Sequence, residues 1–363
     1  MAGTLVVVLA GCDTGSGETT PAPTTALATT TTAATTTQAP LRAAEAIGVS
    51  FPAEGTELVG TLRLPATAGP APAVVFIHGS GPVDRDSRIP GQVGMGFGFE
   101  VAVFAELADG LQASGFAVLT YDKRSCGPFN GCATNGYSIP ADDLTIDTFI
   151  ADASAAVDWL RQRGEVDPEH VSIVGHSQGA QFVIPMLAAD PEIDRGVMIA
   201  GPFQPIDQTI ESQRDFVVDL LEQLGSSRED ALASPAVVPI TDLVTGLENI
   251  RSGSNQPVEG VSAEFWNSWF DLTDRTQQLA SQVRQPVLVV NGELDWNVPA
   301  TEAEAWQMFF DQEGVNAELV VLPCATHALN CLAESDVAAL TPGDIGRGVV
   351  AEAIEQLAAF LEP

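Results

Sequence analysis

Six short apolar runs recur along the chain, with segments of helical spacing between them. They are APAVVFIHG (71–79), FAVLTYD (116–122), VSIVGHS (171–177), GVMIAG (196–201), PVLVVNG (286–292) and AELVVLP (317–323). Strands with apolar residues on both faces are typical of parallel sheets that helices cover on each side. The sequence therefore predicts an α/β fold, with a mostly parallel central sheet flanked by helices and preceded by a hairpin over 47–65.

One stretch interrupts this alternation. Three segments of helical spacing follow one another without an apolar strand between them, at 207–225, 240–253 and 263–283. A helical insertion of this size in an α/β sheet commonly forms a cap over the site; ordinary crossover helices are the alternative. We expect a helical cap insertion at about 203–284, within a folded domain that spans 43–363.

The N-terminal segment differs in composition from the rest. Residues 1–12 end in Leu-Ala-Gly-Cys after an apolar run, which resembles the lipobox of bacterial lipoproteins and implies lipidation of Cys12; an ordinary apolar N-terminus is the alternative. A signal segment should begin with positive charge, yet the first basic residue is Arg42, so either the true start lies upstream or the signal is unusual. Residues 13–42, rich in Thr, Ala and Pro, cannot bury a core and are predicted to be a disordered linker. We expect an exported protein of the cell envelope, lipid-anchored at the outer face of a bacterial membrane.

Four cysteines remain after Cys12, in two close pairs, Cys126/Cys132 and Cys324/Cys331. In an oxidising compartment such cysteines form disulfides, and four of them permit three pairings. The local pairing, Cys126 with Cys132 and Cys324 with Cys331, is favoured.

The charge balance excludes some partners. Acidic residues outnumber basic ones 48 to 15, giving a net charge of −33, and Lys123 is the only lysine. Such a surface repels phosphate backbones, so nucleic acid is not an expected partner. No apolar run reaches the roughly 18 to 20 residues that a spanning helix needs, so contact with a membrane is expected only through the lipid anchor. The sequence does not indicate the oligomeric state.

The run VSIVGHS ends in Gly-His-Ser-Gln-Gly, a strand followed directly by a predicted helix. This order is that of a nucleophile elbow, in which Ser177 is exposed at a sharp turn and Gly175 and Gly179 avoid crowding. A serine hydroxyl needs a base to take its proton. Of the four histidines, three suit that role poorly: His78 in a turn, His170 at the start of a strand and His176 beside Ser177, where neighbours point apart.

His327, in a loop after the last predicted strand, is therefore the expected base, and Glu293 or Asp295 is the acid that orients it. The order of serine, acid and histidine along the chain resembles that of the α/β-hydrolases, from about residue 45 to the C-terminus. The acid loop of that family often reads G-x-x-D-x-x-V-P, matched here by Gly292, Asp295, Val298 and Pro299, so the resemblance favours Asp295 over Glu293.

The resemblance also implies an oxyanion hole. One backbone N–H would come from Gln178, after the nucleophile, and the other from Ser80 in the loop after the third strand; a glycine-rich turn without a donor role is the alternative. HGSGPVDRD (78–86) and YDKRSCG (121–127) are similar to bacterial hydrolases related to dienelactone hydrolase and the prolyl-oligopeptidase-type peptidases. Charged residues in these two motifs are expected to form structural ion pairs, namely Asp84, Arg85, Asp86, Asp122 and Arg124.

These observations predict a serine hydrolase that cleaves small to medium carboxylic esters through an acyl-enzyme, with Ser177, His327 and Asp295 as its triad. No cofactor and no metal is expected, since neither ligand spacing nor a phosphate loop occurs in the sequence. A peptidase or an acyltransferase of the cell envelope is the alternative, and an inactive binding lipoprotein is the third. The expected cap contains four aromatic residues: Phe265, Trp266, Trp269 and Phe270. They either line an acyl pocket or pack against other cap residues, and we favour the packing role.

Overall fold

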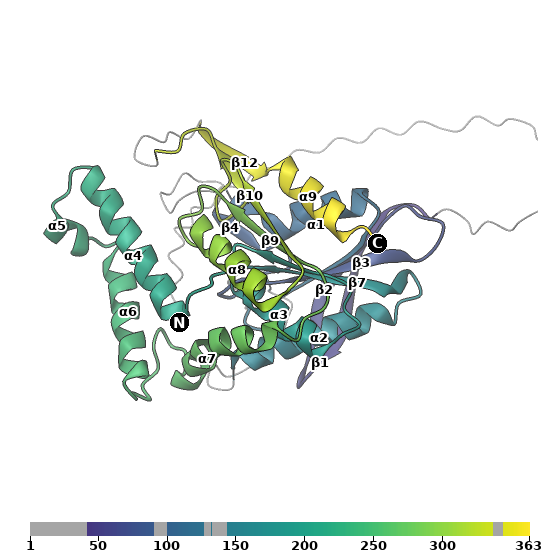
Figure 1. Cartoon of the computed structure of the whole chain (residues 1–363), viewed down its shortest axis with the longest axis horizontal. Helices are drawn as coiled ribbons and strands as arrows, with labels where there is room; N and C mark the ends of the chain where they lie inside the picture. Colours follow the sequence, from purple (N-terminus) through teal and green to yellow (C-terminus); the bar gives the residue numbers. More distant parts are fainter. Residues whose placement is uncertain (1–41, 91–99, 127–131, 133–143, 337–343) are drawn as a thin grey trace, which may run out of the picture.

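An eight-stranded sheet forms the centre of the computed structural model, which describes residues 42–90, 100–126, 132, 144–336 and 344–363 (Figure 1). Its strands, in spatial order, are β1 (Glu45–Ala53), β2 (Thr56–Leu64), β6 (Ala117–Tyr121), β3 (Ala71–Ile77), β7 (Val166–His176), β8 (Gly196–Ile199), β9 (Val287–Gly292) and β10 (Ala317–Leu322). The pairs β1–β2 and β2–β6 are antiparallel, and all other neighbours are parallel. The predicted mostly parallel sheet, including its leading hairpin, is confirmed.

Helices cover both faces of this sheet (Figure 1). One face carries α1 (Val103–Ala113) and α9 (Ala351–Leu361); the other carries α2 (Ile146–Arg161), α3 (Ala180–Ala189) and α8 (Ala300–Glu313), and α7 (Ala263–Ala280) packs on α3 and α2. Successive residues of β3 alternate between the two cores: Val75 and Ile77 pack towards α2 and α3, whereas Val74 and Phe76 pack towards α1 and α9. This double burial explains why the strand is apolar throughout.

The helix α2 shows how local sequence fixes an element. Thr145 precedes it and forms a reciprocal capping box with Thr148, which satisfies backbone N–H groups that have no partner within the helix. Asp147 lies in its first turn and Arg161 in its last, the charge order that the helix dipole favours. Its buried face contributes Phe149, which reaches the region behind the elbow.

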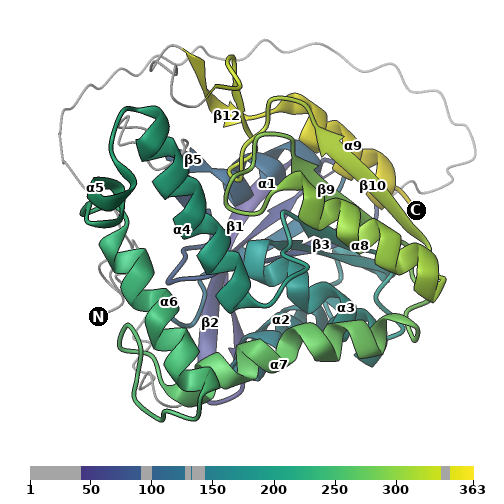
Figure 2. The same ribbon diagram turned by 60° about the vertical axis from the view of Figure 1, so that its left-hand side comes forward.

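Between β8 and β9 lie α4 (Ile206–Gln223), α5 (Arg228–Leu232), α6 (Val238–Arg251) and α7. The helices α4, α5 and α6 form a group to the left of the sheet in Figure 1, whereas α7 packs against α3 and α2 and shares their core. Figure 2 shows α4 and α6 side by side. The predicted helical insertion is thus present, from Ile206 to Ala280, and its role as a cap stays a prediction.

Two short antiparallel pairs lie outside the main sheet: β4 (Arg88–Pro90) with β5 (Glu100–Ala102), and β11 (Asn330–Leu332) with β12 (Ile345–Val349). Within the described ranges no helix has the length and apolar character needed to cross a bilayer. Cys12, the signal segment and the linker up to residue 41 lie outside the described residues.

Candidate active site

Ser177 occupies a sharp turn between β7 and α3, where residues Ser177–Gly179 form a single 3₁₀ turn. Its backbone has φ of +56°, a left-handed conformation that is costly for a residue with a side chain and is found mainly at functional sites. The flanking glycines permit the close packing around this turn. A Cβ on Gly175 would lie 2.2 Å from the Gly179 carbonyl oxygen, and one on Gly179 would lie 2.3 Å from the Ile77 oxygen.

His327 and Asp295 meet at the same edge of the sheet, where β9 and β10 end. The His327 Nδ1 lies 2.8 Å from Asp295 Oδ2. The other oxygen, Oδ1, accepts the backbone N–H groups of Asn297 and Val298, each at 2.9 Å. Asp295 is 3% exposed, whereas Glu293, the other acid of the loop, is exposed. Only Asp295 of the two is therefore placed to hold the imidazole with Nδ1 protonated and Nε2 free to accept a proton.

A second histidine ties the His327 loop to the elbow. His176, the last residue of β7, has its Nε2 2.9 Å from the backbone oxygen of His327, and the two ring centroids lie 4.8 Å apart. Since a carbonyl can only accept, Nε2 of His176 carries the proton. Burial, and to a lesser extent the neighbouring His327, lowers the pKa of His176 to about 3, so this ring is neutral at physiological pH. The sequence indicated only that His176 was a poor base; its contact with the His327 loop depends on tertiary structure.

A disulfide closes the loop that carries His327. Cys324 and Cys331 are joined, with 4.8 Å between their Cα atoms, and the same loop is crossed by a hydrogen bond from Thr326 Oγ1 to Asn330 Oδ1 at 2.6 Å. The other disulfide joins Cys126 and Cys132. The structure thus has the local pairing that the sequence favours.

The two residues expected to donate to an oxyanion lie on either side of Ser177. Gln178 follows Ser177 in the chain and is buried. The loop 78–80 passes close to Ser177: a Cβ atom built on Gly79 would lie 3.2 Å from the Cβ of Ser177. Ser80, next in that loop, is exposed. Their function as donors stays a prediction. Behind both of them lies Lys123, the sole lysine of the sequence, which donates hydrogen bonds to Gly79 and Gln178.

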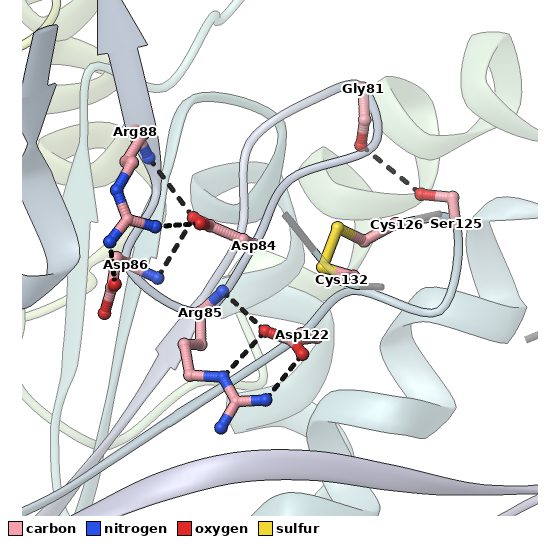
Figure 3. The surroundings of a disulfide bond; sticks show 9 residues. All are labelled: Gly81, Asp84, Arg85, Asp86, Arg88, Asp122, Ser125, Cys126 and Cys132. Atoms are coloured by element: carbon pink, nitrogen blue, oxygen red, sulfur yellow. Dashed lines mark hydrogen bonds and ion pairs between the residues drawn. A yellow bond between two sulfur atoms is a disulfide. The ribbon is translucent and has the colours of Figure 1, made fainter. Parts of the chain in front are cut away.

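All five charged residues predicted to form ion pairs do so. Figure 3 shows Arg88 with Asp84 and Asp86, and Arg85 with Asp122, near the Cys126–Cys132 disulfide. Arg85 donates from Nε to Asp122 Oδ1 at 2.8 Å and from one terminal nitrogen to Oδ2 at 2.6 Å. Arg124 pairs with Asp152 of α2, and both side chains are buried. These pairs fix the loops behind the elbow.

The remaining histidines lie in different settings. His78 is buried, and its ring lies 4.8 Å from that of Tyr121 and 5.2 Å from that of Phe104. Burial, and then the charge of Lys123, lowers the pKa of His78 to about 3. His170 lies half-buried on the irregular first part of β7, with Nδ1 3.0 Å from Asp167 Oδ2. In the part of the chain that the structure describes, no three His, Cys, Asp or Glu residues are grouped as a metal site would require.

The aromatic residues of α7 are packed rather than arranged around an opening. Trp266 and Trp269 stack with their centroids 5.8 Å apart, and Trp269 Nε1 donates to Gln181 Oε1 of α3 at 2.9 Å. A separate contact joins the insertion to the acid loop: Phe216 of α4 stacks on Trp296 at 5.0 Å. The residue beside Asp295 is thus covered by α4.

Known proteins share both sequence and fold with this chain. Residues 93–335 match the family model of serine aminopeptidase, S33. Esterase EstD of Thermotoga maritima is 31% identical over 252 residues, which are 69% of this chain and 52% of that protein. Thiohydrolase apmlB of Arthrinium phaeospermum is 24% identical, over 58% of this chain and 73% of its own.

Among solved structures, the esterase Pf2001 of Pyrococcus furiosus superposes with a TM-score of 0.52 at 17% identity, covering 88% of this chain and 90% of that one. At this identity the likeness concerns the fold alone. The chain spans about half the length of Esterase EstD. With a family model that matches most of its length and the sheet described above, the chain belongs to the serine aminopeptidase S33 family of α/β-hydrolases.

Proposed function

We propose that this chain hydrolyses carboxylic esters of small to medium size through an acyl-enzyme. Ser177 attacks the acyl carbonyl, His327 takes the hydroxyl proton and returns it to the leaving alkoxide, and Asp295 holds the imidazole. The backbone N–H groups of Ser80 and Gln178 stabilise the oxyanion, and water then releases the acid by the reverse sequence.

The observation that carries this proposal is the contact of His327 with the buried Asp295, at 2.8 Å, in a loop that His176 ties to the strained elbow of Ser177. A carboxylate that accepts two backbone N–H groups and one imidazole N–H has its orientation fixed before substrate binds. The similarity to Esterase EstD supports an ester as the substrate.

A fluorophosphonate probe, which phosphonylates activated serines, tests the mechanism. We expect stoichiometric labelling of the wild-type chain and none of Ser177→Ala. Ser172→Ala is the matched control, because Ser172 is a buried serine on β7, the strand that leads to Ser177, and its loss should leave labelling intact. A wild-type chain that is folded but unlabelled would refute the proposal.

A peptidase is the second candidate, favoured by the family description of serine aminopeptidase. Rates for p-nitrophenyl acetate and p-nitrophenyl octanoate, compared with those for aminoacyl p-nitroanilides, separate the two. We expect turnover of the esters and no release of p-nitroaniline above background, since p-nitroaniline is a far poorer leaving group than p-nitrophenolate and a peptidase must bind and orient the amide to expel it. Measurable cleavage of the aminoacyl anilides would assign the chain to the peptidases.

We also propose that the protein is exported and anchored through a lipid on Cys12, which rests on the Leu-Ala-Gly-Cys pattern. Expression in a bacterial host should place it in the detergent phase of a phase partition. Cys12→Ala should move it to the aqueous phase; an unchanged distribution would exclude the anchor.

A further inference from the structure

Lys123, the only lysine in the chain, lies buried directly behind the elbow. Its Nζ donates to the Gly79 carbonyl oxygen at 2.6 Å and to Gln178 Oε1 at 2.8 Å, and lies 4.4 Å from the centroid of the Phe149 ring. A buried ammonium is costly unless its protons have partners. Such a group, bonded on both sides of a nucleophile, is therefore expected to have a specific role.

The geometry of the Gly79–Ser80 peptide shows what that role can be. In a trans peptide the C=O and N–H point in opposite directions, and the described part of the chain contains no cis peptide bonds. The bond from Lys123 draws the Gly79 oxygen into the interior, so the N–H of Ser80, in the same peptide unit, points the other way. The second bond holds Gln178 by its side chain, and Gln178 supplies the other expected donor.

We propose that Lys123 is a positioning residue that orients both N–H donors of the oxyanion hole from behind. Its ammonium does not touch the substrate; it fixes the Gly79–Ser80 peptide plane and anchors Gln178. The inference rests on the proposed serine hydrolase function, because only an acyl transfer through a tetrahedral intermediate needs those donors.

The charge of Lys123 adds a pH dependence to this role. Burial lowers the pKa of Lys123 to about 7, while the carboxylate of Asp152 on α2 opposes that shift. The other titratable groups that line the same small cavity are His78 and Tyr121, and the next residue, Arg124, is paired with Asp152. Below about pH 7 the ammonium holds both acceptors as a charged donor; above it the amine is neutral and the same bonds weaken.

The test compares Lys123→Met, which keeps the length of the side chain without its donors, with the wild-type chain. Both are assayed for kcat/KM on p-nitrophenyl acetate from pH 6 to pH 9 and for inhibition by a trifluoromethyl ketone. Loss of one oxyanion donor slows acyl transfer by roughly 100- to 1000-fold, so we expect about a 100-fold loss at pH 6 with a parallel loss of inhibitor affinity. The ratio of wild type to variant should shrink to about tenfold at pH 9; taking the ratio removes any pH dependence that the two chains share.

Thr120→Val is the matched control, because Thr120 is equally buried on β6 but donates no bond towards the elbow; it accepts one from Arg63. It should retain wild-type kinetics. A folded Lys123→Met with kinetics within about twofold of wild type, or with a loss independent of pH, would overturn the proposal in favour of a purely structural lysine.

If Lys123→Met does not fold, Gln178→Leu decides the question, since it removes one partner of Lys123 and keeps the backbone N–H at 178. About a tenfold loss of kcat/KM and inhibitor affinity is expected, and unchanged values would overturn the proposal. Failure of the wild-type chain to react with the fluorophosphonate would instead refute the proposed function, so the two failures are distinguishable.

Discussion

Two buried neutral histidines make the folded state sensitive to acid. His78 and His176 have pKa values lowered to about 3, in both cases mainly by burial, whereas an unfolded chain binds the same protons near pH 6.5. Between these values the unfolded state binds more protons than the folded state. Stability is therefore fully present above about pH 6.5 and is lost as the pH falls from there towards 3.

The size of the effect follows from the same pKa values. Moving from pH 7.5 to pH 5 should remove about 2 kcal/mol of unfolding free energy for each histidine, or about 4 kcal/mol for both, because the linkage between pH and stability is 1.36 kcal/mol per pH unit once the unfolded group titrates. That is a large fraction of the stability of a typical domain.

Urea unfolding at pH 7.5 and pH 5, followed by the fluorescence of the five tryptophans, measures this loss. His78→Gln and His176→Gln should each make the pH-dependent loss about 2 kcal/mol smaller than in the wild-type chain, whatever they do to stability at pH 7.5. Carboxyl groups that titrate in the same window contribute equally to all chains and cancel in the difference. His170→Gln, at a half-buried surface position beside Asp167, is the control and should leave the loss unreduced. Equal losses in the wild type and in both buried variants would refute the argument.

Three further changes test the site. Asp295→Asn should lower kcat on p-nitrophenyl acetate by about 10³- to 10⁴-fold, because the imidazole loses its orienting carboxylate. Glu293→Gln, at an exposed position, should leave kcat unchanged, and equal effects of the two changes would contradict the assignment of Asp295 as the acid. Gly179→Ala should destabilise the fold by about 1–3 kcal/mol in urea unfolding, since its Cβ would lie 2.3 Å from a carbonyl oxygen, and an unaffected chain would show that the turn is looser than described. Replacing Cys324 and Cys331 by alanine should lower the free energy of unfolding by about 2 kcal/mol and should lower turnover, because the His327 loop is no longer closed by the disulfide. Unchanged turnover and heat stability, in this variant or in reducing agent, would show that the disulfide has no such role.

The sheet could be predicted because its signal is local. The β3 run is apolar at every position since alternate residues enter different cores, and the pattern VSIVGHSQG contains both the strand and the turn. The bounds of β9 and β10 differ from the expected runs by at most one residue at each end. The pairs β4–β5 and β11–β12 were not expected, because strands of three to five residues carry no periodicity that separates them from loops.

Contacts between distant segments limited the prediction of the site. The sequence favours Asp295 over Glu293 only through the resemblance of the acid loop; in the structure Asp295 contacts His327, whereas Glu293 is exposed. Neither His176 nor Lys123 could be linked to the site from sequence, since their partners lie 151 and 55 residues away. The helical spacing of α7 likewise did not reveal that this helix packs on α3, because the pattern is the same whichever surface its apolar face meets.

Lys123 also gives the protein an unusual chemical handle. Lys123 is the only lysine of the protein and is 4% exposed. Reagents that react with side-chain amines therefore cannot reach one on the surface of the folded protein. Acylation of that residue would require the region behind the elbow to open. The rate of such labelling, followed by mass spectrometry of the peptide that contains Lys123, would therefore report how often this part of the molecule opens in solution.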